Sequence, residues 1–131
     1  MTHYTVIGAG HGGKAMAAHP ALMGYPVTLY NRTDANVDPI RKRHGIELES
    51  FEGGPHGFGR LALVTSDMAE ALAEAEIVMM VVPSSAHADI ARLAAPHLRN
   101  GQIVVLHPGR TLGAIEFRHV LERQGCRADV T

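Results

Sequence analysis

The chain has 131 residues, of which 46% are hydrophobic and 19% charged, and its formal net charge is −1. This length predicts one domain with its own core, and the near-neutral charge gives no indication of a nucleic-acid or membrane partner. The single cysteine, Cys126, excludes an internal disulfide framework and a zinc cluster built on cysteines. The nine histidines form no metal-binding motif. We therefore expect a cytoplasmic protein without a metal site.

The first part of the chain alternates between short apolar runs and helical patterns. In order, these predict a strand, an Ala- and Met-rich helix, a second strand and a polar helix at residues 4–7, 12–23, 26–30 and 34–44. The polar helix is expected to begin near Thr33 or Asp34, which are residue types that cap helices. Residues 45–59 hold five glycines and little periodicity, which predicts a loop or an irregular hairpin.

The rest of the chain repeats the alternation. The predicted order is strand, helix, strand, helix, strand, helix and the beginning of a strand at residues 61–65, 67–75, 77–83, 86–95, 102–109, 112–123 and 127–131. Ser66 or Asp67 can cap the first of these helices, and Ser84 or Ser85 the second. The strand at 77–83 is apolar at every position, which is typical of a parallel strand buried on both faces. The strand at 102–109 is interpreted as another buried strand, which ends in a turn.

Strands that alternate with helices predict an α/β fold. We expect a Rossmann-type, doubly wound parallel sheet with helices on both faces. Residues 127–131 resemble only the beginning of a strand. We therefore expect that residues 1–131 are one nucleotide-binding domain of a longer enzyme. Sheet and helix surface left uncovered by the rest of that enzyme would allow self-association, for example into a homodimer.

Three glycines near the start are spaced G-x-G-x-x-G between the first strand and the first helix. Gly8 permits a tight turn, Gly10 lets the backbone approach a pyrophosphate, and Gly13 lets the helix pack against the strand. His11 and Gly12 belong to the same turn, whose N–H groups would face the phosphates. This context favours a dinucleotide site over a purely structural glycine turn.

The end of the second predicted strand indicates which dinucleotide is bound. NAD sites usually carry an acid there that binds the ribose 2′-hydroxyl. This chain has Asn31, Arg32 and Thr33 instead, and its first acid is Asp34. Arg32 can pair with a 2′-phosphate, with Asn31 and Thr33 as hydrogen-bond donors, which favours NADP over NAD. The alternative is that Arg32 is a solvated loop residue.

Two further turns follow strands at the same edge of the predicted sheet. Ligands of open α/β sheets bind outside the carboxyl ends of the strands. Pro83 and Ser84 would pass beside the ribose and phosphates. The second turn would lie near the nicotinamide and the substrate, and it consists of His107, Pro108, Gly109, Arg110 and Thr111. Arg110 and Thr111 precede a helix and can bind an anion, or they are only turn and cap residues.

Beyond these motifs, the stretches "VVPSSAHADIA" and "HPGRTLGAIEF", together with the glycine turn, resemble the N-terminal domain of the opine dehydrogenases. The resemblance covers about residues 4–131. It implies an oxidoreductase that reduces the imine of an amino acid and a 2-keto acid with NAD(P)H. It also implies that the catalytic His–Asp pair lies in a second, helical domain, so no catalytic residue is assigned here.

The same resemblance implies which positions bind the cofactor. These are Gly8, Gly10, Gly13, Arg32, Pro83 and Ser84, and the loop from Pro108 to Thr111 would face the nicotinamide cleft. The chain departs from the family at His11 and His107, where asparagine is usual. Two other interpretations remain open: the cofactor domain of an enzyme similar to glycerol-3-phosphate dehydrogenase or ketopantoate reductase, and a stand-alone nucleotide-sensing module.

Overall fold

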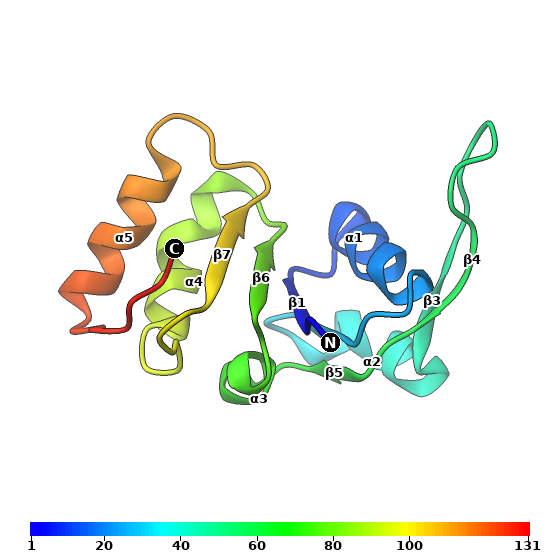
Figure 1. Cartoon of the computed structure of the whole chain (residues 1–131), viewed down its shortest axis with the longest axis horizontal. Coiled ribbons are helices and arrows are strands. Elements are labelled where there is room, and N and C mark those ends of the chain that lie inside the picture. The colour runs from blue at the N-terminus through cyan, green and yellow to red at the C-terminus, as the bar shows by residue number, and fades with distance from the viewer.

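A five-stranded parallel sheet forms the centre of the computed structural model, which describes residues 1–131 (Figure 1). The strand order is β5-β2-β1-β6-β7, and every neighbouring pair is parallel. The strands are β1 (Tyr4–Ile7), β2 (Val27–Tyr30), β5 (Leu63–Thr65), β6 (Ile77–Met80) and β7 (Ile103–Leu106). The order reverses at β1, so β1 and its two neighbours define the switch point at which such sheets bind ligands.

Helices cover both faces of this sheet and produce two separate cores. One face carries α1 (His11–Leu22) and α2 (Asp34–Arg43), and the other carries α3 (Met68–Ala73), α4 (His87–Ala94) and α5 (Gly113–Arg123). Neighbouring strand residues alternate between the cores, so that Val6 packs under α1 while Ile7 packs under α4 and α5. The predicted doubly wound fold is confirmed. No helix has both the length and the apolar character needed to cross a membrane.

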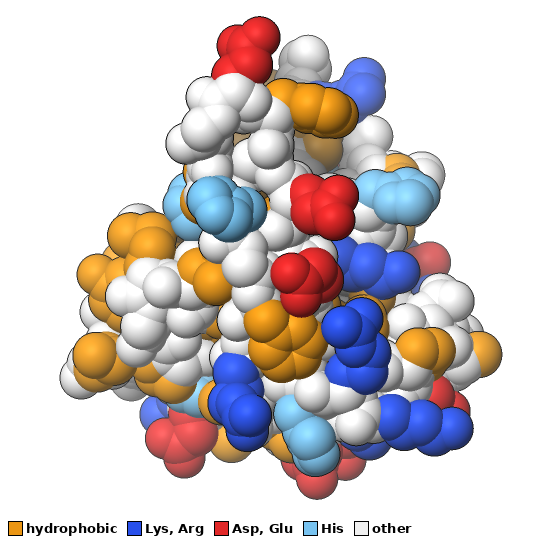
Figure 2. Space-filling view, turned by 90° about the vertical axis from the view of Figure 1, so that its right-hand side faces the viewer, with side chains coloured by type: hydrophobic (Ala, Val, Ile, Leu, Met, Phe, Trp, Pro, Cys, Tyr) orange, Lys and Arg blue, Asp and Glu red, His pale blue; other side chains and the backbone are white.

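Residues 45–60 form a hairpin, which confirms one of the two predicted alternatives. It consists of the antiparallel strands β3 (Gly45–Leu48) and β4 (Gly57–Arg60) and extends beyond the sheet (Figure 1). A Cβ on Gly59 would lie 2.7 Å from the carbonyl oxygen of Ala18, so this glycine lets β4 pack closely against α1. Figure 2 shows this side of the molecule, where basic, acidic and apolar side chains are interspersed.

The strand that precedes α5 is less buried than its sequence predicts. The expectation that the strand at residues 102–109 is buried is wrong, since Ile103 and Val105 are 42% and 38% exposed. The strand is β7, at the end of the sheet, and none of its residues belongs to the core under α1 and α2. Thr131 lies beside it: its N–H donates to Gln102 (3.1 Å), and its carbonyl accepts from Val104 (2.8 Å). Residues 127–131 thus pair with β7 without forming a regular strand.

Helix starts agree only partly with prediction. Asp67 caps α3, because its carboxylate accepts hydrogen bonds from the N–H groups of Ala69 (2.8 Å) and Glu70 (3.3 Å). The expectation that Ser84 or Ser85 caps the next helix is wrong. A 3-10 turn, η1 (Ser84–Ala86), precedes α4, and the carbonyl of Pro83 accepts from Ala86, so backbone replaces the hydroxyl cap.

Candidate functional site

The turn between β1 and α1 depends on glycine at two of its positions. Gly8 has φ +115°, and a Cβ there would lie 2.4 Å from the carbonyl oxygen of Val81. A Cβ on Gly13 would lie 1.8 Å from the carbonyl oxygen of Gly8. These contacts agree with the turn and packing roles predicted for the two residues. Gly10 differs, because no atom lies within 4 Å of the space that its Cβ would fill.

Beside that open space, the first turn of α1 has unpaired backbone donors. Gly10 occupies the N-cap position without a side-chain cap, and the first helical bond runs from Lys14 to its carbonyl. The N–H groups of residues 11–13 find no acceptor within the chain, and no acidic residue lies in this turn. His11 and Gly12 are both exposed and belong to this first turn of α1. Free N–H groups and the positive end of the helix dipole suit an anion such as a pyrophosphate.

Asn31 connects the glycine turn to the end of β2. Its Oδ1 accepts a hydrogen bond from the N–H of Ala9 (3.1 Å), and its Nδ2 donates to the carbonyl and hydroxyl oxygens of Thr33 (3.3 Å each). Both ends of the amide are therefore bonded within the chain, and the Thr33 hydroxyl is used by Asn31 rather than as a cap for α2. This network differs from the free donors that the sequence predicted, and it holds the turn against β2.

Arg32 follows the same end of β2, next to the crevice that open α/β sheets have outside the carboxyl ends of the strands, here β2, β1 and β6. Its side chain is 63% exposed, and Nη1 lies 3.9 Å from Oδ2 of Asp89 in α4. The nearby acid Asp34 is occupied elsewhere, since it accepts from Ser66 (2.7 Å) and Arg41 (3.2 Å). These two hydrogen bonds lower the pKa of Asp34, which therefore stays ionised and paired away from the crevice.

The other predicted loops meet at the carboxyl ends of β6 and β7. A cavity of about 360 Å³ is lined by residues 81–84, His107, Pro108 and Arg110. A second cavity, of about 440 Å³, shares Ser84 and Arg110 with the first and has only polar, charged and glycine residues in its lining. It adds Ser85, His87, Gly109, Thr111, Gly113 and Glu116. The structure thus brings together the two turns that the sequence assigned to the ribose and the substrate cleft.

Comparison with known proteins identifies the kind of domain that has this arrangement. A family model described as the NAD binding domain of 6-phosphogluconate dehydrogenase matches residues 3–127. The chain belongs to this family. It is therefore an NAD-binding domain, which agrees with the free helix N-terminus beside Gly10.

Two curated relatives agree with the predicted resemblance. Opine dehydrogenase from Arthrobacter sp. (strain 1C) is 38% identical over 122 residues, which are 93% of this chain and 33% of that protein. Glycerol-3-phosphate dehydrogenase (NAD(P)+) from Leuconostoc mesenteroides subsp. mesenteroides is 30% identical over 124 residues, or 93% and 36%. The chain thus spans about a third of the length of the curated relatives it matches, and the resemblance to opine dehydrogenases is confirmed.

Solved structures show the same fold. Octopine dehydrogenase with NADH and pyruvate superposes with a TM-score of 0.82 at 19% identity, over 99% of this chain and 35% of that chain. Ketopantoate reductase from Ralstonia eutropha JMP134 has a TM-score of 0.76 at 23% identity, over 98% and 40%.

His87 is a residue of this NAD-binding domain that sequence reasoning missed. It is 1% exposed, lines the polar cavity, and its Nε2 has no hydrogen-bond partner; Nε2 of His107 is also buried and unpaired. The available signal was helical spacing, because His87 precedes the buried residues Ile90, Ala91 and Ala94 by three, four and seven positions. A polar residue on the apolar face of a predicted helix, directly after the turn that follows a strand, is therefore a candidate site residue.

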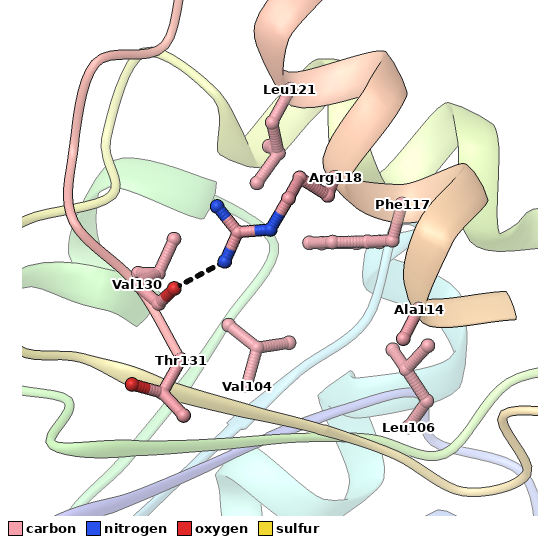
Figure 3. Close-up of a pocket in the computed structure, with 8 residues that line it drawn as sticks. All are labelled: Val104, Leu106, Ala114, Phe117, Arg118, Leu121, Val130 and Thr131. Atoms are coloured by element: carbon pink, nitrogen blue, oxygen red, sulfur yellow. Dashed lines mark hydrogen bonds between the residues drawn. The ribbon is translucent and has the colours of Figure 1, made fainter.

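A third cavity lies beneath α5 and is apolar (Figure 3). Its volume is about 100 Å³, and Val104, Leu106, Phe117 and Leu121 form most of its walls. Arg118 closes one side by donating a hydrogen bond to the carbonyl of Val130 (2.7 Å). This volume is below the range usual for ligand pockets, so we assign no cofactor contact to it.

Proposed function

We propose that the chain is the cofactor domain of an NAD(P)-dependent oxidoreductase of the opine dehydrogenase type. Such an enzyme reduces the imine formed between an amino acid and a 2-keto acid. The observation that carries the proposal is the open space at Gly10 beside the unpaired N–H groups of α1, since a dinucleotide needs both a donor set and room for its pyrophosphate. The 38% identity to an opine dehydrogenase supports the choice of substrate class.

In this proposal each loop has its own part in binding. The turn from Gly8 to Gly13 holds the pyrophosphate, and Pro83 and Ser84 lie beside the ribose. The turn from His107 to Thr111 borders the nicotinamide, where Arg110 provides a positive charge for a substrate carboxylate. The bound cofactor supplies the hydride, while the residues of this chain bind and orient the reactants. The groups that move protons would come from a second, helical domain, and the cytoplasm stays the expected location.

We further propose that the cofactor is NADP in preference to NAD. No acid follows β2 directly, and the first one, Asp34, is already bonded to Ser66 and Arg41. The guanidinium of Arg32 is exposed and can approach a 2′-phosphate. The second candidate function, a glycerol-3-phosphate dehydrogenase or ketopantoate reductase, shares this cofactor site and differs only in the substrate. The 30% identity to a glycerol-3-phosphate dehydrogenase is the observation that favours it.

Cofactor titration tests both parts of the proposal. We expect saturable binding of NADPH and NADH, followed by cofactor fluorescence, with NADPH bound more tightly. Arg32→Ala should weaken NADPH binding by about tenfold to a hundredfold, the usual range for a hydrogen-bonded charge, and change NADH binding by less than about twofold. Arg123→Ala, which removes an exposed arginine at the end of α5, is the matched control.

Two results would contradict the proposal, and they differ. If neither cofactor bound, the nucleotide-binding role itself would be wrong. If the wild-type chain bound NADH as tightly as NADPH and Arg32→Ala changed neither, only the NADP preference would be wrong.

A further inference from the structure

Asp89 places a carboxylate opposite the proposed ribose site from the far side of the crevice. Arg32 follows β2, and Asp89 lies in the first turn of α4, which follows β6. Because β2 and β6 are the two neighbours of β1, the Arg32–Asp89 pair bridges the carboxyl end of β1, where the glycine turn begins. The acid that pairs with Arg32 therefore comes from α4 and not from the end of β2.

The pair is loose enough for a ligand to rearrange it. Nη1 of Arg32 and Oδ2 of Asp89 are 3.9 Å apart, and both side chains are more than half exposed. Asp89 makes its shorter contact with Arg92, which donates to Oδ1 at 2.7 Å. Asp89 thus stays in place through Arg92 while only partly neutralising Arg32, which can leave it without a large energetic cost.

We propose that Asp89 is a specificity-determining residue that limits the preference for NADPH. The inference rests on the proposed function, because it assumes that Arg32 meets the ribose of a dinucleotide. A 2′-phosphate carries close to two negative charges and must compete with the Asp89 carboxylate for the guanidinium of Arg32. The 2′-hydroxyl of NADH carries no charge and can donate a hydrogen bond to that carboxylate. Asp89 therefore weakens the binding of NADPH without weakening the binding of NADH.

Asp89→Asn tests this directly, since it keeps the shape of the side chain and removes its charge. We expect NADPH to bind about threefold to fivefold more tightly, which is the size typical of exposed, screened charges, while NADH binding is unchanged or slightly weaker. The NADPH gain should shrink as salt is added. Glu122→Gln on α5 changes the net charge equally, far from the crevice, and should leave both affinities as in the wild type.

A double mutant separates competition for Arg32 from other causes. In the Arg32→Ala background, Asp89→Asn should lose most of its effect on NADPH, because the group for which Asp89 competes is gone. If the gain persisted there, Arg92 or simple repulsion would be responsible and the inference would be wrong. An equal gain for both cofactors, or no gain with both cofactors still bound, would also overturn it. Loss of all binding in the wild-type chain would instead refute the proposed function.

Discussion

The two ends of the parallel sheet are built in opposite ways. At the amino end, side chains pair with the backbone: Gln102 is 3% exposed, and its amide bonds to Arg99, Leu72 and Ala75 at 2.7–3.0 Å. His3 joins the same end, since its N–H donates to Glu76 (2.9 Å) and its ring bonds to Thr28 (2.9 Å). At the carboxyl end, the N–H groups of residues 11–13 at the start of α1 have no partner, and two histidine nitrogens are buried without partners.

This difference separates the residues that stabilise the domain from those that are available to bind. A buried polar group without a partner destabilises the fold, so such groups persist mainly where function requires them. Two residues at the carboxyl end, Arg110 and Leu112, also have the left-handed backbone conformation that is unfavourable for residues other than glycine, with φ of +49° and +60°. Substitutions at the amino end should therefore change stability, and substitutions at the carboxyl end should change ligand binding.

Gly13→Ala is expected to have the largest effect of the substitutions considered. It should change stability and ligand binding together, although it lies at the carboxyl end. Its Cβ would lie 1.8 Å from the carbonyl oxygen of Gly8, so either the turn or the helix must move. We expect the free energy of unfolding to fall by about 3 kcal/mol or more, a large part of the stability of a typical domain, and cofactor binding to be lost. Denaturant unfolding and NADH titration of the same sample would measure both.

Gly10→Ala is the matched control for that substitution. The added methyl group meets no protein atom and the residue has φ −74°, so stability should change by about 1 kcal/mol or less. It fills the proposed pyrophosphate space, so cofactor affinity should fall by at least about tenfold. Unchanged affinity would show that the phosphates lie elsewhere.

Gln102→Ala should have the next largest effect and act on stability alone. It removes the amide that bonds to the carbonyls of Leu72 and Ala75 and to the N–H of Arg99. The Ala75 carbonyl and the Arg99 N–H then lose their partner, while the Leu72 carbonyl still accepts from the N–H of Ala75 (3.3 Å). We expect a loss of about 2–4 kcal/mol, with unchanged cofactor affinity of the folded fraction. Gln124→Ala, at an exposed glutamine, is the control. A change in affinity without a loss of stability would contradict the division between the two ends.

The sequence predicted the fold well because the fold depends on local patterns. Alternating apolar runs identified all five parallel strands, and Asp67 was recognised as a cap from its residue type and position. The exposed face of β7 could not be read from its sequence, because an apolar run does not reveal whether a helix from elsewhere in the chain reaches it. The same limit applies to Ser84, whose capping role was taken over by the backbone of a 3-10 turn.

The candidate site was predictable only where one turn defines it. The glycine spacing indicated the turn and the close approach of Gly13 to Gly8, since these two residues lie near each other in the sequence, but it did not indicate the contact between Gly8 and Val81. The partners of Arg32 and Asn31 were not predictable, because Asp89 lies 57 positions from Arg32 and Ala9 lies 22 positions before Asn31. His87 was missed for a related reason: its burial depends on packing between α4 and the start of α5.

His3 offers the smallest effect and a pH-dependent test of the amino end. Burial lowers the pKa of His3 by more than Glu74 and Glu76 raise it, so folding favours the neutral ring that bonds to Thr28. The unfolded chain, with the ordinary pKa of 6.5, therefore takes up this proton first as the pH falls. The stabilisation from His3 should be present above pH 6.5 and decrease below it.

Urea unfolding between about pH 7.5 and 5.5 should show a shallower loss of stability for His3→Gln than for the wild type, while His97→Gln, at an exposed histidine, retains the wild-type slope. Equal slopes for wild type and His3→Gln would show that folding does not favour the neutral ring of His3.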